Sequence, residues 1–131
     1  MSRKLDAAIA EALGKKVVWR KKKESYLGGS GYVDAQPNEE GARQFISHGI
    51  VLGDIQPYST DGNAMLELDK EMRAREFVLE LKFINYPESV IALYWQLPKS
   101  RQYENFSEAN TEPLARALAA YRALTGEEWS E

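Results

Sequence analysis

The sequence predicts an α+β fold, in which an antiparallel sheet is packed with three amphipathic helices. Apolar residues recur at helical spacing in three segments, 2–13, 61–75 and 112–124. Two strand-like runs, 77–84 and 90–97, are separated by little more than the turn sequence "NYPE", so they should pair as antiparallel neighbours. Helices with one apolar face must cover such a sheet to bury that face. We therefore expect the order helix, strands, helix, two strands, helix.

The first helix should span 2–13 and lead into strands. Ser2 can cap this helix and Gly14 can end it, and its apolar stripe consists of Leu5, Ala8, Ile9, Ala12 and Leu13. The segment "KVVWR" predicts a strand near 15–20, because it is rich in β-branched and aromatic residues. "ESYLGGSGYVD" then predicts a hairpin around a glycine-rich turn. The stretch 36–56 is poorly periodic and predicts a loop with at most one short element.

The middle helix should begin at "PYSTD", with an apolar stripe of Met65, Leu68 and Met72. In the strand that follows, apolar residues alternate with a second set that includes two charged ones, which predicts one buried and one wetter face. The next strand, "SVIALYWQL", is apolar throughout, as expected of a central strand. Trp95 within it should therefore belong to the core.

The last helix should run over 112–124. Thr111 is its expected cap, Pro113 lies in its first turn, and Gly126 should end it. Its apolar stripe consists of Leu114, Ala117, Leu118, Tyr121 and Leu124. The preceding stretch, 98–108, predicts an exposed polar loop that carries aromatic residues.

The composition is that of a soluble globular protein with a single domain over 1–131. Hydrophobic residues make up 44% of the chain and charged residues 28%. No apolar run reaches the length of about 18 residues that a membrane span needs, so we expect no membrane partner. The lack of cysteine excludes disulfides and thiol chemistry, and it fits a reducing cytoplasm. A net charge of −3 argues against a general binder of duplex nucleic acid, which needs a basic excess.

A local basic run interrupts this acidic average. Residues 15–23, "KKVVWRKKK", hold six basic residues and no acid. Such a face on an acidic protein suits a small anion better than a long duplex. Trp19 and Arg20 inside the run suit stacking on a base with pairing to a phosphate. They suit a protein interface equally well, and a solvated strand end is the simpler alternative.

Two predicted helix starts also offer donors to an anion. "YSTD" and "ANTEP" each place hydroxyl groups beside the free backbone N–H groups of a first turn. The candidate ligand contacts in and near these segments are Tyr58, Ser59, Thr60, Asn110, Thr111 and Arg116. The tyrosine would stack on a base, and the arginine would pair with a phosphate. Simple helix capping is the structural alternative at either start.

Motifs for catalysis are lacking. His48 is the only histidine, so one chain cannot build a two-histidine centre. "GGSG" lacks the lysine of a phosphate loop and is typical of a hairpin turn. The acids around the middle helix lack the spacing of a calcium loop. We therefore expect no enzyme, no catalytic residues, no metal site and no cofactor.

Three segments together resemble a known family. "LDAAIAEALG", "PYSTD" and "ANTEPLARALAAYRAL" occur in this order across nearly the whole chain. This order is similar to that of the phage ABA sandwich domain family, whose members have a first helix and a tryptophan-bearing strand, then "P-x-Y-S-T-D", then "A-(D/N)-T-x-P-x-A". The stretch "GNAMLEL" departs from the pattern, because the family usually carries a tryptophan there. The loop 98–108 is also less typical.

The resemblance implies a function in phage defence evasion. Small phage proteins of this type are similar to the first class of Thoeris anti-defence proteins, which bind cyclic ADP-ribose-type signals, and in related members cyclic oligonucleotides, without cleaving them. By this resemblance the chain would sequester a host immune nucleotide in the cytoplasm of the infected bacterium. It would assemble as a homo-oligomer, a dimer or a hexamer built from dimers, with Tyr26, Tyr32, Tyr103 and Phe106 available to line the seam. The alternative is a non-enzymatic phage structural or regulatory protein that acts through protein–protein contacts.

Overall fold

The structure is a computed structural model that describes residues 3–24, 30–49, 51–85, 88–96 and 106–130. Within these ranges the chain forms, in order, α1 (Arg3–Ala12), β1 (Lys16–Glu24), β2 (Ser30–Asp34), β3 (Arg43–His48), β4 (Val51–Asp54), α2 (Gly62–Ala74), β5 (Phe77–Asn85), β6 (Glu88–Gln96), β7 (Phe106–Ala109) and α3 (Glu112–Thr125). The strand pairs in these ranges are antiparallel. The predicted α+β class is confirmed.

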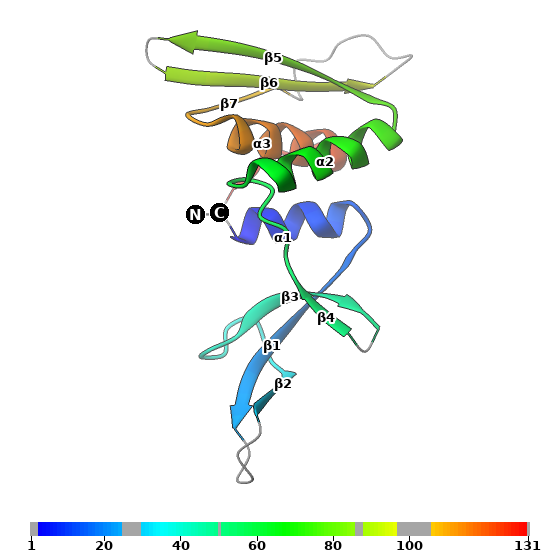
Figure 1. Cartoon of the computed structure of the whole chain (residues 1–131), viewed down its shortest axis with the longest axis vertical. Helices are drawn as coiled ribbons and strands as arrows, with labels where there is room; N and C mark the ends of the chain where they lie inside the picture. Colours follow the sequence, from blue (N-terminus) through cyan, green and yellow to red (C-terminus); the bar gives the residue numbers. More distant parts are fainter. Residues whose placement is uncertain (1–2, 25–29, 50, 86–87, 97–105, 131) are drawn as a thin grey trace.

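The strands form two sheets, whereas the sequence predicted one. Their orders are β2-β1-β3-β4 and β5-β6-β7 within the described ranges. Figure 1 shows α2 and α3 as a layer beneath β5–β7, with α1 between that layer and the four-stranded sheet. The helices therefore separate β1 from β5 and β6. β1 pairs instead with β2 and β3 on its own side of the helices.

The prediction of a loop over 36–56 was wrong for half of that stretch, which contains β3 and β4. In β3 the neighbouring residues Phe45 and Ile46 are both buried, although they point to opposite faces of the sheet. A strand with apolar residues on both faces shows no alternation with a period of two, so the periodicity analysis missed it. Gly49, with a φ of 78°, forms the turn between β3 and β4.

The core lies between the two sheets and is centred on small residues of α3. Leu5 and Ile9 of α1 are fully buried there, as predicted. In α3 the buried residues are Ala115, Ala117, Ala119 and Ala120, whereas Leu114, Leu118, Tyr121 and Leu124 are only partly buried. α3 packs on α1, α2, β6 and β7, so it buries more than one face. The sequence prediction assumed that this helix buries a single face, so it missed three of these four alanines. Their small side chains let neighbouring elements approach closely.

The three-stranded sheet packs one face on the helices. Tyr94 is fully buried on that face, and Leu79 and Leu81 lie partly buried against the same core. Trp95, the next residue along β6, points to the opposite face and is only partly buried. The prediction that Trp95 belongs to the core between sheet and helices was therefore wrong, because both faces of β6 are apolar in sequence.

The described helix ends that were predicted are confirmed, whereas the expected cap Ser2 lies outside the described residues. Asp61 caps α2 by accepting a hydrogen bond from the Ala64 N–H at 2.9 Å, and Thr111 caps α3 in the same way. α3 ends at Gly126, whose φ of 76° suits glycine. After α2, however, the left-handed position is occupied by Glu76, with a φ of 66°. A residue with a side chain is uncommon in this conformation.

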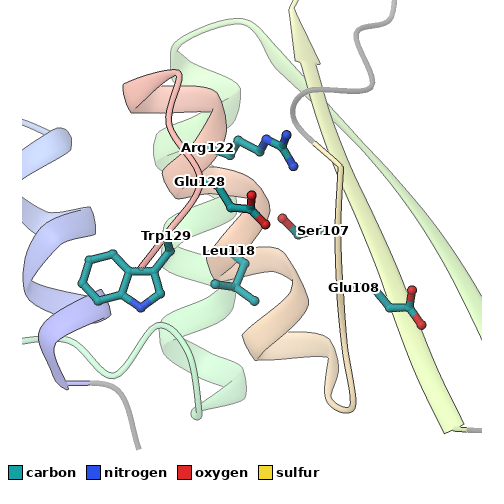
Figure 2. A pocket seen from close by; sticks show the side chains of 6 residues that line it. All are labelled: Ser107, Glu108, Leu118, Arg122, Glu128 and Trp129. Atoms are coloured by element: carbon teal, nitrogen blue, oxygen red, sulfur yellow. The ribbon is translucent and has the colours of Figure 1, made fainter. Parts of the chain in front are cut away.

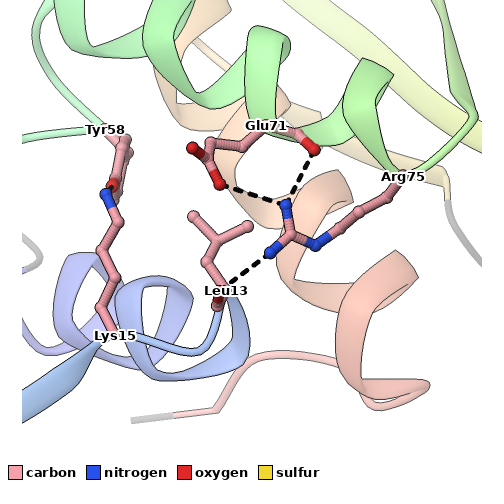
Figure 3. A network of polar contacts seen from close by, with 5 residues as sticks. All are labelled: Leu13, Lys15, Tyr58, Glu71 and Arg75. Carbon is pink, nitrogen blue, oxygen red and sulfur yellow. Dashed lines mark hydrogen bonds and ion pairs between the residues drawn. The ribbon is translucent and has the colours of Figure 1, made fainter.

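Arg75 joins the ends of α1 and α2, as Figure 3 shows. Its guanidinium donates to the backbone oxygen of Leu13 at 2.9 Å, and to the backbone oxygen and carboxylate of Glu71 at 2.9 and 3.1 Å. Carbonyl groups at helix ends lack partners within the helix, and here a side chain supplies the donors. This contact holds the helical layers in register.

Candidate nucleotide-binding site

A pocket of about 250 Å³ lies between the start of α1 and the four-stranded sheet. Its lining residues are Arg3, Lys4, Trp19, Ala42, Arg43 and Gln44. β1 and β3 pair in the register Trp19↔Gln44 and Val17↔Ile46, so these four side chains share one sheet face. Ile46 is buried in the core and Val17 packs against it. The face that carries Trp19 is therefore the face turned toward α1. We call this cavity the Trp19 pocket.

The Trp19 pocket is positively charged. Its lining residues include three cationic ones, Arg3, Lys4 and Arg43, and no acid. The Arg3 guanidinium donates to the backbone oxygen of Ile55 at 3.0 Å, which fixes its position. Arg43 faces Arg20 in the β1–β3 register, so its side chain points to the other face of the sheet. There its guanidinium lies 5.5 Å from the centre of the Phe45 ring and 4.0 Å from the Asp54 carboxylate. Cations beside an indole ring suit a ligand with an aromatic base and a phosphate.

The Trp19 pocket also has an unpaired acceptor. Gln44 Oε1 is buried and has no hydrogen-bond partner among the described residues. A buried polar atom without a partner costs about 1–3 kcal/mol, and an amino group of a ligand would supply the missing donor. Carboxamide side chains pair with the N6 and N7 atoms of adenine in nucleic-acid recognition. The amide, the indole and the cations are therefore a set that suits an adenine nucleotide.

Arg20 lies on the other face of the same sheet. It forms an ion pair with Asp34 and lies opposite Arg43 in the β1–β3 register. Its Nε is buried and has no hydrogen-bond partner within the part of the chain that the structure describes. Arg20 thus neighbours a lining residue of the Trp19 pocket without lining the pocket itself.

Tyr58 and Ser59 are structural in this fold. Tyr58 is 1% exposed and its hydroxyl accepts a hydrogen bond from Lys15 Nζ at 3.1 Å. Ser59 is 2% exposed and its backbone N–H donates to the Asp6 carboxylate at 3.0 Å. Neither residue presents the surface contact to a ligand that the sequence suggested, because both are packed between α1 and α2.

The remaining part of "YSTD" forms the tight turn that starts α2. The backbone N–H groups of Thr60 and Asp61 both donate to the backbone oxygen of Pro57, at 3.2 and 3.0 Å. This turn contains three consecutive residues of types that can cap a helix, Ser59, Thr60 and Asp61, and their roles differ. Asp61 caps α2, Ser59 holds the turn on α1, and Thr60 is exposed. The donors expected to receive a phosphate here are mostly engaged within the chain.

Burial dominates the electrostatics of Asp6, which is 1% exposed in the first turn of α1. It raises the pKa of the Asp6 carboxyl above its ordinary value, while the hydrogen-bonding contact with Ser59 and the Arg3 cation oppose the rise. Arg3 therefore acts both on this carboxylate and in the lining of the Trp19 pocket.

The start of α3 is accessible but is occupied by its own cap. Asn110 and Thr111 are both exposed. The Thr111 hydroxyl accepts a hydrogen bond from the Leu114 N–H at 3.4 Å, which is the capping alternative for this segment. The described structure brings neither residue into the Trp19 pocket.

Arg116 belongs to a second cavity, of about 710 Å³, beneath the first half of β5. We call it the Arg116 groove, and its lining residues are Asp69, Arg73, Glu76, Phe77, Val78, Leu79 and Arg116. The Arg116 side chain is 12% exposed, lies 3.8 Å from Glu112, and has a buried Nε without a partner among the described residues. Arg116 and Trp19 therefore lie in different cavities of one chain.

A buried phenol–carboxylate pair lies beside the Arg116 groove, which its carboxylate, Asp69, helps to line. The Tyr94 hydroxyl donates to Asp69 at 3.2 Å, and Arg73 Nε lies 2.9 Å from the same carboxylate. Burial, and next the negative charge of Asp69, raise the pKa of Tyr94, so its hydroxyl stays protonated at neutral pH. The acids in this groove offset its cations, which makes it less suited to an anion than the Trp19 pocket.

A third cavity, of about 350 Å³, lies between β7, α3 and the C-terminal segment. Figure 2 shows its lining residues, Ser107, Glu108, Leu118, Arg122, Glu128 and Trp129. The Trp129 ring packs edge-on against Tyr121, with the ring centres 5.2 Å apart. With two acids and one cation in its lining, this cavity does not favour a phosphate.

The described ranges show neither a cluster of metal ligands nor a membrane-spanning helix. They contain no cluster of three or more His, Cys, Asp or Glu residues that could hold a metal ion. None of the helices found there has the length and apolar character to cross a membrane.

Comparisons with known proteins leave the resemblance untested. No protein-family model matches the chain, and neither a curated protein nor a solved structure matches it. The similarity to the phage ABA sandwich domain family therefore stays a prediction that rests on three motifs.

Sequence reasoning found Trp19 but missed its neighbours in the pocket. Arg3 and Lys4 precede the apolar stripe of α1, and Arg43 and Gln44 lie in the stretch that was expected to be a loop. These four residues meet only because α1 packs on the face of β1 and β3. The sequence did contain one indication of this pocket: the basic residues Arg3 and Lys4 open the first helix, and a basic strand follows that helix.

Proposed function

We propose that the protein binds a small anionic nucleotide in the Trp19 pocket and holds it intact, as a sponge for a host immune signal of the cyclic ADP-ribose or cyclic oligonucleotide type. The observation that carries this proposal is the make-up of the pocket. An indole ring, an unpaired amide acceptor and the cations of Arg3 and Lys4 lie together, and the lining contains no acid. The resemblance of the three motifs to signal-sequestering phage proteins supports the same class of function, in the cytoplasm of an infected bacterium.

The aromatic, carboxamide and cationic residues around the pocket have separate roles in this proposal. Trp19 stacks on the base, and Gln44 accepts a hydrogen bond from its amino group. Lys4 and Arg3 pair with phosphate oxygens, for which the guanidinium fork of arginine is well matched. Arg20 and Arg43 face each other on the other side of the sheet and extend the positive field beyond the pocket.

The same lining supports binding without cleavage. The side chains that line the described pocket are cationic, aromatic, aliphatic or carboxamide groups. None of these groups serves as a general base at neutral pH, and hydrolysis of a phosphodiester or glycosidic bond needs a positioned base or nucleophile. Sequestration is therefore better supported than hydrolysis.

The size of the pocket favours a second copy as part of the site. At about 250 Å³ it is smaller than the roughly 300–1,000 Å³ typical of small-molecule sites. One chain would enclose a base and part of the sugar–phosphate, and the rest of a cyclic nucleotide would extend beyond it. A homo-oligomer, a dimer or a hexamer built from dimers, would complete the enclosure.

Calorimetry with cyclic ADP-ribose isomers and cyclic di- and trinucleotides tests the proposal. We expect binding to at least one of them, and a loss of affinity of about tenfold or more in Trp19→Ala, Gln44→Leu and Lys4→Ala. Lys70→Ala is the matched control, because Lys70 is also an exposed helix lysine but lies on α2, away from the pocket. Chromatography of the released ligand should recover it unchanged, and recovery of a cleaved product would contradict sequestration.

A role in protein–protein contacts is the second candidate. It is favoured by the apolar side chains that the four-stranded sheet exposes, Tyr32 at 45% and Val51 at 60%. Of the four aromatic residues expected at a subunit seam, Tyr26 and Tyr103 and the side chain of Phe106 lie outside the described residues. If heat-unfolded protein releases no nucleotide and calorimetry finds no binding, this second function is the one to pursue.

A further inference from the structure

We infer that two copies of the chain pair antiparallel through the outer edge of β5, with Leu81 of each copy at the two-fold axis. The two three-stranded sheets then form one continuous sheet. This inference concerns an interaction surface far from the Trp19 pocket, and it does not rest on nucleotide binding.

The outer edge of β5 is the longest open sheet edge in the described structure. β5 has nine residues and pairs with β6 on one side only. The other edge strands, β2, β4 and β7, have five, four and four residues. An edge strand presents unpaired backbone N–H and C=O groups, and a long one is a template for pairing with another chain. Figure 1 shows β5 in the outermost layer of the molecule, above α2.

The sequence of β5 is complementary to itself about Leu81. In an antiparallel pair centred there, Glu80 lies opposite the partner's Lys82, and by symmetry this charge pair occurs twice. The other facing pairs are apolar or end pairs: Leu81 with the partner's Leu81, Leu79 with the partner's Phe83, Val78 with the partner's Ile84, and Phe77 with the partner's Asn85. Opposite charges across strands stabilise a sheet, and like charges directly opposite destabilise it.

Other registers lack this match. A shift of the facing pairs by two residues in one direction brings Glu80 opposite the partner's Glu80, and a shift in the other direction brings Lys82 opposite the partner's Lys82. A shift by one residue would place the apolar, helix-facing side chains of β5 in one copy on the same sheet face as the outward-facing side chains of β5 in the other copy. Of these registers, only the one centred on Leu81 pairs opposite charges and also keeps the helix-facing sides of both copies on one face of the sheet.

The same register explains an exposed aromatic side chain and an open cavity. Phe83 pairs with the core residue Val90 in β6, so it lies on the helix-facing side of the sheet, yet it is 60% exposed. In the proposed dimer the partner's Phe83 lies opposite Leu79. Leu79 and Phe77 line the Arg116 groove on that side of the sheet. Each copy thus places its exposed phenylalanine at the mouth of the groove of the other copy.

Sedimentation velocity at micromolar concentration tests the dimer with charge variants. We expect the wild-type chain to associate, as this dimer or as a larger oligomer built from such dimers. Lys82→Glu brings acids opposite each other and Glu80→Lys brings bases opposite each other, so each variant alone should dimerise at least tenfold more weakly. An equimolar mixture of the two variants restores both opposite-charge pairs and should sediment as a heterodimer.

Two exposed apolar side chains provide a matched comparison. Phe83→Ser should weaken the dimer by tenfold or more, whereas Val51→Ser, at the same 60% exposure but in β4 of the other sheet, should leave it unchanged. Three results would overturn the inference: a wild-type monomer, a mixture of charge variants that does not form heterodimers, or an equal effect of the two serine variants. Because Lys82 is exposed, its variant is expected to fold, and the charge test stands even if Phe83→Ser unfolds.

Discussion

The carboxylate of Asp6 in α1 accepts a hydrogen bond of 3.0 Å from the backbone N–H of Ser59, a residue 53 positions later in the chain. Both residues are almost fully buried. This contact holds the turn before α2 against the first helix.

Asp6→Ala should destabilise the fold by about 1–3 kcal/mol, because it leaves the buried Ser59 N–H without an acceptor. Asp6→Asn keeps an acceptor oxygen and should cost less. Urea unfolding followed by circular dichroism measures both. Equal losses for the two variants would show that the acceptor is unimportant.

The raised pKa of Asp6 should make its contribution depend on pH. At a pH below the unfolded value of 3.8, the carboxyl is protonated in both states. As the pH rises through 3.8 and then through the higher folded pKa, the unfolded chain loses this proton first, so the unfolded state gains stability relative to the folded state. The wild-type protein should therefore lose stability relative to Asp6→Asn across this window. Unfolding curves of both proteins between about pH 3 and pH 7 test the sign, and a constant difference would contradict it.

Arg75→Ala should lower the free energy of unfolding by about 1–3 kcal/mol, since it removes the donors to Leu13 and Glu71. Arg75→Lys should recover little of this loss, because an ammonium group cannot span both acceptors as the planar guanidinium does. Lys70→Ala is the control, because that side chain is 76% exposed and its ion-pair partner Glu67 is also exposed. Thermal unfolding that ranks Lys70→Ala as the more damaging change would argue against the role of Arg75.

Glu76→Gly should stabilise the protein by about 1 kcal/mol, because glycine adopts a positive φ without the steric cost that a Cβ brings. Glu76→Ala should bring no such gain, and this comparison separates backbone relief from removal of the charge. Chemical denaturation of the three proteins provides the measurement. A gain that is equal in both variants would point to charge.

Local sequence patterns were sufficient to predict the position of most helices and strands, but they did not predict how the strands are arranged in sheets. α1, α2, α3, β5 and β6 lie close to their predicted positions because each shows a clear period or clear end signals. β3 escaped notice because Phe45 and Ile46 are buried on opposite faces. The division into two sheets depends on the helices between them, and no short stretch of sequence encodes that placement.

The candidate site was only partly predictable for the same reason. Trp19 was singled out by its basic neighbours in the chain, whereas Lys4 and Gln44 become its neighbours only through packing. Tyr58 and Ser59 were plausible ligand contacts by residue type, yet their partners, Lys15 and Asp6, are more than 40 residues away in sequence. Residue type identifies capable side chains, and only tertiary contacts decide whether they are already engaged.

The four-stranded sheet contacts the helical layers chiefly through α1, as the lower half of Figure 1 shows. Elements with few contacts to the rest of a protein open at lower free energy than the global unfolding reaction, as separate units of hydrogen exchange. β1–β4 should therefore form such a unit, with faster amide exchange than β6 and α3. The Trp19 pocket lies at the junction between this unit and α1, so a bound ligand would slow the exchange of amides far from any atom it touches.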